Sequence, residues 1–369
     1  MKESQNKKKT RVLKEVIQMK SYKKLAVIIP VAALSTSVLF SPVMTFAAEK
    51  PENKVIQKTN NIQGYLIKNG VKTPVYQQHA MPKGANSSQI GPVSPEFPIL
   101  PENPLEGIPQ SGKSVTELGD IGDIVYFDKN MESDDEYDGS KPGHLPNGKV
   151  GKKYLQKTSA GVISGFYDPE TFELYPFSNL TALVKMFPDS PEWNPVKEVY
   201  QKFIDIFDGT TKLKRETQYS LIDSSLVDST ATYKFNQSVK HGVSTGNIFG
   251  FAATVGIKIN LKAGLIPTVL ELSSELSESL TTTYQHSIIV TDETTNTQEF
   301  SVGKVDNPSY KYNKYAGAAY QLNSTYSVVP GNGLKKLQAA NPDYKLANSV
   351  YNYKDNQLYF TVTPGSHVQ

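Results

Sequence analysis

Strict alternation of apolar and polar residues is the clearest pattern along the chain, and it is strongest over residues 250–262. Successive side chains of a β-strand point to opposite faces, so alternate residues share a face. The even-numbered positions are small or polar and include Lys258 and Lys262. The odd-numbered positions are apolar: Phe251, Ala253, Val255, Ile257, Ile259 and Leu261. This pattern predicts a strand with one face toward lipid and one toward water, as in a transmembrane barrel.

The segment that follows this strand is apolar where a hairpin turn is usually polar. Residues 263–268 read Ala-Gly-Leu-Ile-Pro-Thr, with Leu265, Ile266 and Pro267 at the centre. Large apolar side chains are a poor choice for a turn that stays in water. At the leading end of a hairpin that crosses a bilayer they are favourable, so these three residues are predicted to form a membrane-crossing tip.

The return segment, residues 269–284, continues the alternation less cleanly. One parity carries leucines, at Leu270, Leu272, Leu276 and Leu280. The other parity is acidic or hydroxyl-bearing and includes Glu271 and Glu275. A strand here would complete one amphipathic β-hairpin over residues 247–286, with the leucines toward lipid.

The charges of the two predicted strands suit a water-filled lumen. Lys258 and Lys262 would share that face with Glu271 and Glu275, and opposite charges across a hairpin are favourable. Glu278 departs from the pattern because it falls on the lipid-facing parity. Either the lower part of the return strand lies outside the membrane, or its register slips there and exchanges the two faces.

Two other structures fit parts of the pattern. Leu272, Leu276 and Leu280 also recur at i, i+4 and i+8, which is the spacing of an amphipathic helix. A half-buried sheet in a soluble protein would explain the alternation but not the apolar turn. The strand formers of Thr281–Tyr284 favour a strand beyond the leucines, so the hairpin is the expected structure.

The N-terminal residues have the order of a secretory signal peptide. Lys23 and Lys24 precede an apolar run from Leu25 through Phe40, and small residues follow. This order predicts a cleaved signal over residues 1–47, with Met19 as an alternative start, and a secreted protein. A transmembrane anchor is the other interpretation, but the run is short for a bilayer span of about 20 residues and is interrupted by proline.

Charge and composition exclude several classes of function. The chain has 39 Lys+Arg and 36 Asp+Glu residues, and without residues 1–47 the numbers become 30 and 34. The clustered basic residues that nucleic acid would require are therefore missing. Cysteine is absent, which excludes thiol catalysis, disulfides and thiolate zinc sites. The five histidines form no His-Glu-x-x-His pair, and no Gly-x-Ser-x-Gly turn occurs, so neither an enzyme nor a cofactor is expected.

A change in residue composition near residue 210 predicts two domains after the signal peptide. Residues 48–210 contain a Pro-rich linker at 82–109 and the two convincing helices, Ser178–Met186 and Val196–Phe207. This part is expected to bind a receptor. Residues 211–369 are rich in Ser and Thr and run in long alternating stretches. The predicted fold is mainly β, with long antiparallel strands and a few short helices in the N-terminal part.

The order of these features resembles aerolysin and the clostridial epsilon-toxin/mosquitocidal-toxin family. The resemblance covers about residues 212–330: the alternating strand, the Leu265-Ile266-Pro267 turn, the segment Val269–Ser273, a Thr-rich strand and Ser/Thr-rich flanks. It implies an elongated, multi-domain protein that binds a receptor on a target-cell surface and assembles into a ring, commonly of seven copies. The ring would insert the 247–286 hairpins as one shared β-barrel. Residues 48–210 match no known pattern.

The sequence therefore predicts a secreted pore-forming toxin whose partners are a target-cell membrane, an unidentified protein or glycan receptor, and further copies of itself. The alternative is a secreted β-rich adhesin or glycan-binding protein that never enters a membrane. The apolar turn at 263–268 separates the two, because an adhesin has no need of it.

Overall fold

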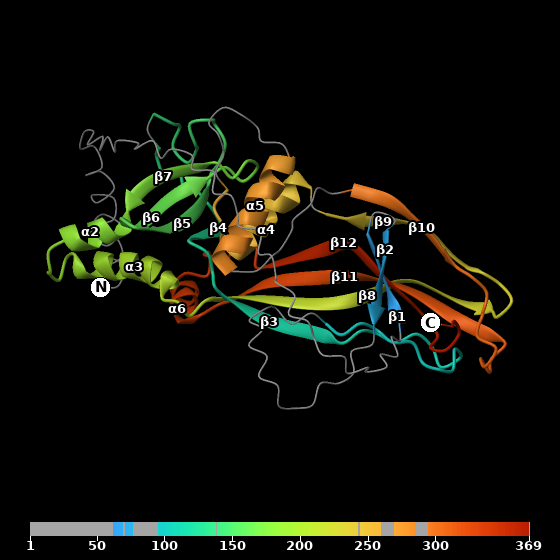
Figure 1. The fold of residues 1–369 in the computed structure, drawn as a ribbon. Coiled ribbons are helices and arrows are strands. Elements are labelled where there is room, and N and C mark those ends of the chain that lie inside the picture. Colours follow the sequence, from blue (N-terminus) through green and yellow to red (C-terminus); the bar gives the residue numbers. More distant parts are fainter. Residues whose placement is uncertain are drawn as a thin grey trace, which may run out of the picture. The chain divides into compact units, whose positions relative to one another are not determined.

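In the computed structural model, the chain forms two compact units, residues 1–59 and residues 60–369. The structure describes residues 62–68, 71–76, 95–137, 139–242, 244–259, 269–284 and 294–368, all in the second unit (Figure 1). The predicted signal peptide lies outside the described residues. Strands predominate over helices and every sheet is antiparallel, which confirms the mainly β prediction.

The main sheet has six strands in the order β2-β1-β12-β11-β8-β3. Its strands are β1 (Ile62–Lys68), β2 (Val71–Tyr76), β3 (Lys113–Asp120), β8 (Lys212–Asp228), β11 (Lys314–Val329) and β12 (Val350–Val362). Strands β8 and β11 are 17 and 16 residues long and pair along their whole length. Because β1, β2 and β3 precede residue 210 while β8, β11 and β12 follow it, the two predicted domains contribute to one sheet.

Strand β11 is buried on both faces, since the main sheet is covered on both sides. On one side Tyr320 and Tyr359 pack with Leu100 from the Pro-rich segment. On the other side Tyr315 and Phe360 pack with the ends of a separate two-stranded sheet. That sheet pairs β9 (Tyr233–His241) with β10 (Thr294–Val302). Two helices, α4 (Thr245–Val255) and α5 (Val269–Tyr284), lie between β9 and β10 in the chain.

A separate four-stranded sheet has the strand order β4-β5-β6-β7. It consists of β4 (Ile124–Asn130), β5 (Lys152–Thr158), β6 (Gly161–Tyr167) and β7 (Leu174–Asn179). Its core contains apolar residues of α2 (Leu180–Met186), α3 (Asn194–Ile204), the short helix η2 (Asp205–Phe207) and α6 (Asn332–Ala340). The predicted helices Ser178–Met186 and Val196–Phe207 are thus confirmed. The Asn179 side chain accepts a hydrogen bond from the Ala182 amide and so caps α2.

Phe127 provides a test of this second core. Its side chain is fully buried, and its ring meets Tyr344 edge to face at 5.3 Å. We expect Phe127→Ala to lower the free energy of unfolding by about 3–5 kcal/mol, because the cavity adds to the lost transfer free energy. Urea titration followed by circular dichroism measures the change. Val115→Ala, at a side chain 54% exposed on β3, should stay within about 0.5 kcal/mol, and equal effects of the two variants would contradict the assignment.

Candidate functional site

Residues 245–255 and 269–284 are helices, so the prediction of two strands over 247–286 is wrong for this conformation. The helical alternative for Leu272, Leu276 and Leu280 is the one that the structure adopts. Those leucines lie along the buried side of α5. No helical alternative was foreseen for residues 250–262, where the alternation is cleanest.

Helix α4 forms because it is buried on every side from Ile248 to Val255 and capped at both ends. The Ser244 hydroxyl accepts a hydrogen bond from the Asn247 amide, and Gly256 ends the helix with a left-handed φ of 70°. The small residues predicted to face water are buried as well, including Ala252 and Thr254. The Thr254 hydroxyl donates a hydrogen bond to the Gly250 carbonyl at 2.9 Å, so this buried hydroxyl has a hydrogen-bond partner. A helix that is apolar all round is stable only in such a setting.

Helix α5 is amphipathic, and leucine and glutamate are good helix formers. Leu276 and Leu280 are fully buried, whereas Glu278 is exposed. Hydroxyls on this helix bond back along it: Ser277 donates to the Ser273 carbonyl at 2.7 Å, and Thr281 donates to the Ser277 carbonyl at 2.8 Å. These hydrogen bonds satisfy the Ser and Thr hydroxyls within the helix. The strand propensity of this segment therefore did not decide its structure.

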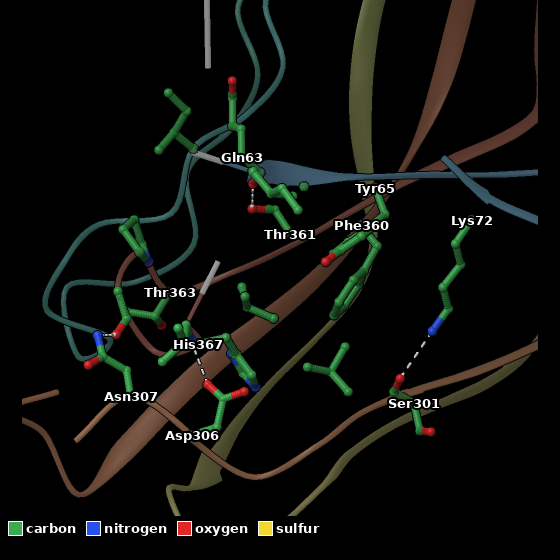
Figure 2. A pocket seen from close by; sticks show the side chains of 18 of the residues that line it. Gln63, Tyr65, Lys72, Ser301, Asp306, Asn307, Phe360, Thr361, Thr363 and His367 are labelled. Atoms are coloured by element: carbon green, nitrogen blue, oxygen red, sulfur yellow. Dashed lines mark hydrogen bonds between the residues drawn. The ribbon is translucent and has the colours of Figure 1, made fainter. Parts of the chain in front are cut away.

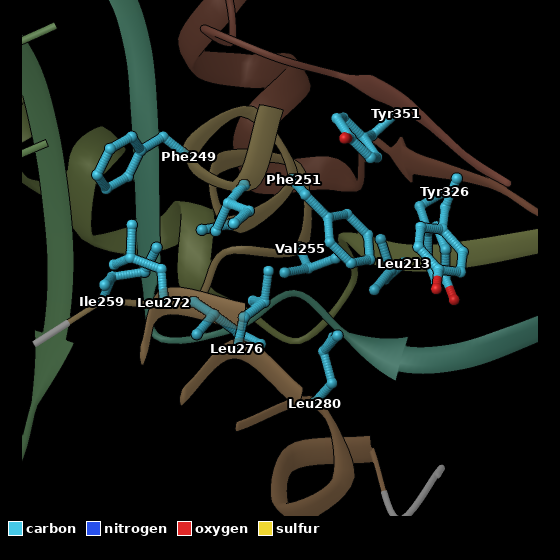
Figure 3. Close-up of a cluster of buried hydrophobic side chains, with 14 residues drawn as sticks. Leu213, Phe249, Phe251, Val255, Ile259, Leu272, Leu276, Leu280, Tyr326 and Tyr351 are labelled. Atoms are coloured by element: carbon cyan, nitrogen blue, oxygen red, sulfur yellow. The ribbon is translucent and has the colours of Figure 1, made fainter. Parts of the chain in front are cut away.

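The apolar side chains of both helices join the end of the main sheet in one core of fourteen residues (Figure 3). Phe251 lies between Tyr326 of β11 and Tyr351 of β12, with ring centroids 4.7 and 4.8 Å away. Phe249 stacks on Phe172 at 5.0 Å. The members that belong to the predicted lipid-facing set are Phe251, Val255, Ile257, Ile259, Leu272 and Leu276. The side chains predicted to meet lipid are therefore the ones that hold this segment on the protein.

Phe172 is under backbone strain at this contact. Its φ is 59°, the left-handed region that residues other than glycine rarely adopt. Such a conformation costs roughly 1–3 kcal/mol and persists where the surroundings enforce it. The ring packs against Tyr126 and Tyr167 as well as Phe249, so aromatic contacts offset the strain, and the contact with Phe249 depends on α4 staying in place.

The end of α4 is held by backbone rather than by side chains. The Gly122 amide donates to the Val255 carbonyl and the Ile124 amide donates to the Gly256 carbonyl, both at 3.2 Å. The approach is so close that a Cβ added to Gly122 would lie 2.0 Å from the Gly256 carbonyl oxygen. We call Gly122, Ile124, Val255 and Gly256 the glycine clamp.

The polar side of α5 borders an open hollow of about 810 Å³. Most of its charged groups are acidic: Asp120, Asp123, Glu275 and Glu278, with Lys258 as the counter-charge. Helix α5 is therefore fixed from the side of its leucines, while its other side faces water and a predominance of negative charge. Lys258 and Glu275, predicted to share a lumen, already line the same hollow.

The remaining predicted residues are placed as follows. Ala253 is buried on α4, and Leu270 and Glu271 belong to the helical backbone of α5. The rest lie outside the described residues: Leu261, Lys262 and the tip residues Leu265, Ile266 and Pro267.

The strands that flank the helices were not recognised as a pair from the sequence. Strands β9 and β10 pair without a shift from Tyr233↔Val302 to His241↔Thr294. They form the base of a hairpin whose far part is occupied by α4 and α5. The alternation of Tyr233, Phe235 and Val239 was a signal of strand, but a partner some sixty residues away is not visible in a local pattern.

A second hollow, of about 780 Å³, lies where β1, β12 and the C-terminal residues meet (Figure 2). Its polar groups are engaged within the protein. Lys72 Nζ donates to the Ser301 carbonyl at 3.2 Å, and the Thr361 hydroxyl donates to the Gln63 carbonyl at 2.7 Å. Asp306 Oδ1 accepts from the Val368 amide at 2.7 Å. These contacts join the tail to the sheet, so they account for the polar lining without a ligand.

Comparison with known proteins gives no family, because no family model matches the sequence and a search of curated proteins finds no match. Within the described ranges, no helix combines the length and apolarity needed to cross a bilayer. Histidine and carboxylate side chains in the same ranges do not gather into a group of three that could hold a metal ion.

The glycine clamp can be tested by adding a single methyl group. We expect Gly122→Ala to weaken the docking of α4 by about 1–3 kcal/mol, because a Cβ cannot fit against backbone. Gly246→Ala is the matched control: Gly246 lies in the first turn of α4 with nothing within 4 Å, and alanine there should stabilise by about 0.4–1 kcal/mol. Hydrogen exchange of residues 245–284 measures both. Unchanged exchange in Gly122→Ala would show that the clamp does not hold the helix.

Proposed function

We propose that this protein is a secreted pore-forming toxin and that residues 242–293 are its membrane-inserting segment. In this proposal α4 and α5 leave the main sheet and convert to strands that extend the β9–β10 hairpin into the membrane. The observation that carries the proposal is the position of two helices with buried apolar side chains, α4 and the amphipathic α5, between two strands that are already paired.

The energetics of the helix core support a transfer to lipid. Each large apolar side chain of this core would lose about 1.5–3 kcal/mol on exposure to water. Nine of them come from α4, α5 and the residues just after α4: Ile248, Phe249, Phe251, Val255, Ile257, Ile259, Leu272, Leu276 and Leu280. Release into water alone is therefore strongly unfavourable. A bilayer interior supplies another apolar environment for those of the side chains that enter it, so release becomes feasible only beside a membrane.

The pattern of residues 250–262 supports strands as the inserted form. Backbone groups in hydrocarbon must all be hydrogen-bonded, which leaves helices and closed barrels as the spanning structures. Helix α4 has eleven residues, against about 20 for a helical span. The same residues alternate at the strand period, as a barrel strand requires.

A barrel also requires several copies of the chain. One hairpin contributes two strands, and membrane barrels have at least about eight, so at least about four copies would assemble. The resemblance to the aerolysin and epsilon-toxin family suggests a ring of seven. A receptor on the target cell, either a protein or a glycan, would concentrate the copies on the membrane surface.

The alternative function, a secreted adhesin or glycan-binding protein, would most naturally use the hollow of Figure 2. Its support is weaker because the polar groups named there are bound to the protein's own backbone. An adhesin would also give no reason for a buried, strand-patterned helix between paired strands.

Locking α4 to its neighbour tests the proposal. A Cβ added at Gly250 would lie 2.8 Å from the Asn348 side-chain nitrogen, so these two positions adjoin each other, and the native chain has no cysteine to interfere. We expect Gly250→Cys with Asn348→Cys to release no dye from liposomes of target-cell lipid when oxidised. Reduction should restore release, because α4 is then free to leave.

The matched control is Gly250→Ser with Asn348→Ser, which has similar side chains and no crosslink. It should release dye with or without a reductant. Full release by the oxidised double-cysteine protein, with the crosslink verified by mass spectrometry, would contradict the proposal that α4 must undock.

The predicted tip gives a second test. We expect Leu265→Asp with Ile266→Asp to reduce dye release at least tenfold, because two carboxylates would have to pass through hydrocarbon at a cost of about 2–3 kcal/mol each or more. Leu105→Asp with Val115→Asp changes two exposed apolar side chains elsewhere and should leave release unchanged. Equal release by both double variants would exclude Leu265 and Ile266 from the leading end.

A further inference from the structure

The pairing of β9 with β10 carries information about the membrane-bound state, and this deeper step rests on the proposed function. We propose that the β9–β10 register continues without a shift through residues 251–284, so that the surface in contact with lipid hydrocarbon ends at Ile257 and Glu278. The Glu278 carboxylate would then lie among the lipid headgroups.

In the existing β9–β10 pair, each strand buries the side chains of one parity. The buried side of β9 is formed by odd-numbered residues, including Phe235 and Val239. The buried side of β10 is formed by even-numbered residues, including Phe300, which pairs with Phe235 and stacks on it at 4.6 Å. Directly opposed residues in an antiparallel ladder share a face, so an odd residue of the first strand meets an even residue of the second.

The second step continues this ladder beyond His241↔Thr294, one residue forward on the first strand and one back on the second. The apolar residues of the two helices then meet each other: Val255 opposes Leu280, and Ile259 opposes Leu276. The other face becomes polar: Thr254 opposes Thr281, Gly256 opposes Ser279, and Lys258 opposes Ser277. The alternation of apolar and polar faces in β9 and β10 therefore continues through the sequences of both helices, although the helices are not paired as strands in this conformation.

A slip of one residue can be rejected on the same residues. It would set Leu280 opposite Thr254 or Gly256 and bring Leu276 and Leu280 to the polar face, while their partners on α4 kept the apolar face. A slip of two residues preserves the faces but moves the turn. The unshifted ladder closes at Pro267 and Thr268, within the predicted apolar tip, and proline suits a turn because it cannot donate to a ladder.

The third step concerns length. A strand that crosses a bilayer at the usual tilt needs about 9–11 residues. Ile257 precedes Pro267 by ten residues, and Ile257 is the position opposite Glu278 in the unshifted register. The single acidic residue on the apolar face therefore falls where the hydrocarbon ends. Glu278 is then a boundary residue, and Phe251, Ala253 and Val255 lie on the near side of the membrane rather than in it.

The same register describes the water-filled side. Within the band the lumen face holds two cations, Lys258 and Lys262, and two anions, Glu271 and Glu275, per copy. Equal numbers leave no net charge in the band, so the pore should discriminate only weakly between small cations and anions. Lys258→Glu would add two negative charges per copy to the balance and should make the pore prefer cations.

Single-cysteine labelling of the cysteine-free chain tests the register. An environment-sensitive dye at Ile259→Cys or Leu276→Cys should shift to the blue on liposome binding and be quenched by nitroxides deep in the acyl chains. Dye at Lys258→Cys or Ser277→Cys should instead be quenched by aqueous iodide. Dye at Glu278→Cys should be quenched best by a nitroxide at the headgroup. Deep quenching at Glu278→Cys would overturn the boundary.

Disulfide trapping tests the pairing itself. Thr254 is fully buried in α4 while Thr281 is exposed on α5, so Thr254→Cys with Thr281→Cys should crosslink only after membrane insertion. The matched control, Thr254→Cys with Ser279→Cys, represents a slip of two residues and should crosslink at least tenfold more slowly. Faster trapping of the control would overturn the unshifted register.

The outcomes separate this inference from the function on which it rests. Dye release accompanied by labelling at a helical period of 3.6 residues would overturn the register and leave a pore. Absence of both release and insertion would overturn the two together. In asymmetric KCl, the unmodified pore should have a reversal potential near zero, and Lys258→Glu should move it toward the equilibrium potential of the cation. Strong selectivity of the unmodified pore would overturn the neutral lumen.

Discussion

A helix that is apolar on every side must be covered on every side, and most of the architecture around α4 follows from this constraint. Tyr326 and Tyr351 at the end of the main sheet cover one side, and the leucines of α5 cover another. Phe172 accepts an unfavourable backbone conformation to cover Phe249. At Gly122 and Gly256 there is no room for a side chain, so backbone amides of the glycine clamp complete the enclosure.

The mainly β class and the helices α2 and α3 were predicted correctly because local patterns decided them. The prediction of strands failed over residues 245–255 and 269–284 for two physical reasons. Small residues such as Ala252 and Gly256 fit a water-facing strand face and a buried helix equally well, so alternation did not distinguish them. A spacing of four residues, as in Leu272, Leu276 and Leu280, is twice the strand period and close to one helical turn, so both structures place these leucines on one side.

The interleaving of sequence across residue 210 could not be read from the chain either. Strand partners such as β3 with β8, or β1 with β12, are chosen by contacts between distant segments rather than by local propensity. The predicted tip and the signal peptide remain predictions, because those residues lie outside the described part of the structure. The structure adds the position of this segment in the fold. The segment, whose sequence suits both a helix and a strand, is held at both ends by β9 and β10, which are already paired with each other.

For the conversion proposed above, the pairing of β9 with β10 has a kinetic consequence. In a free chain, a hairpin of roughly fifty residues must first bring its ends together, at an entropic cost of roughly 3.5 kcal/mol from loop closure alone. Here β9 and β10 already hold the ends at strand spacing. Each new pair of strand residues can then form next to an existing pair, so no separate nucleation event is required. The rate of conversion should accordingly be governed by how fast the helices detach, and hardly at all by the search for a partner.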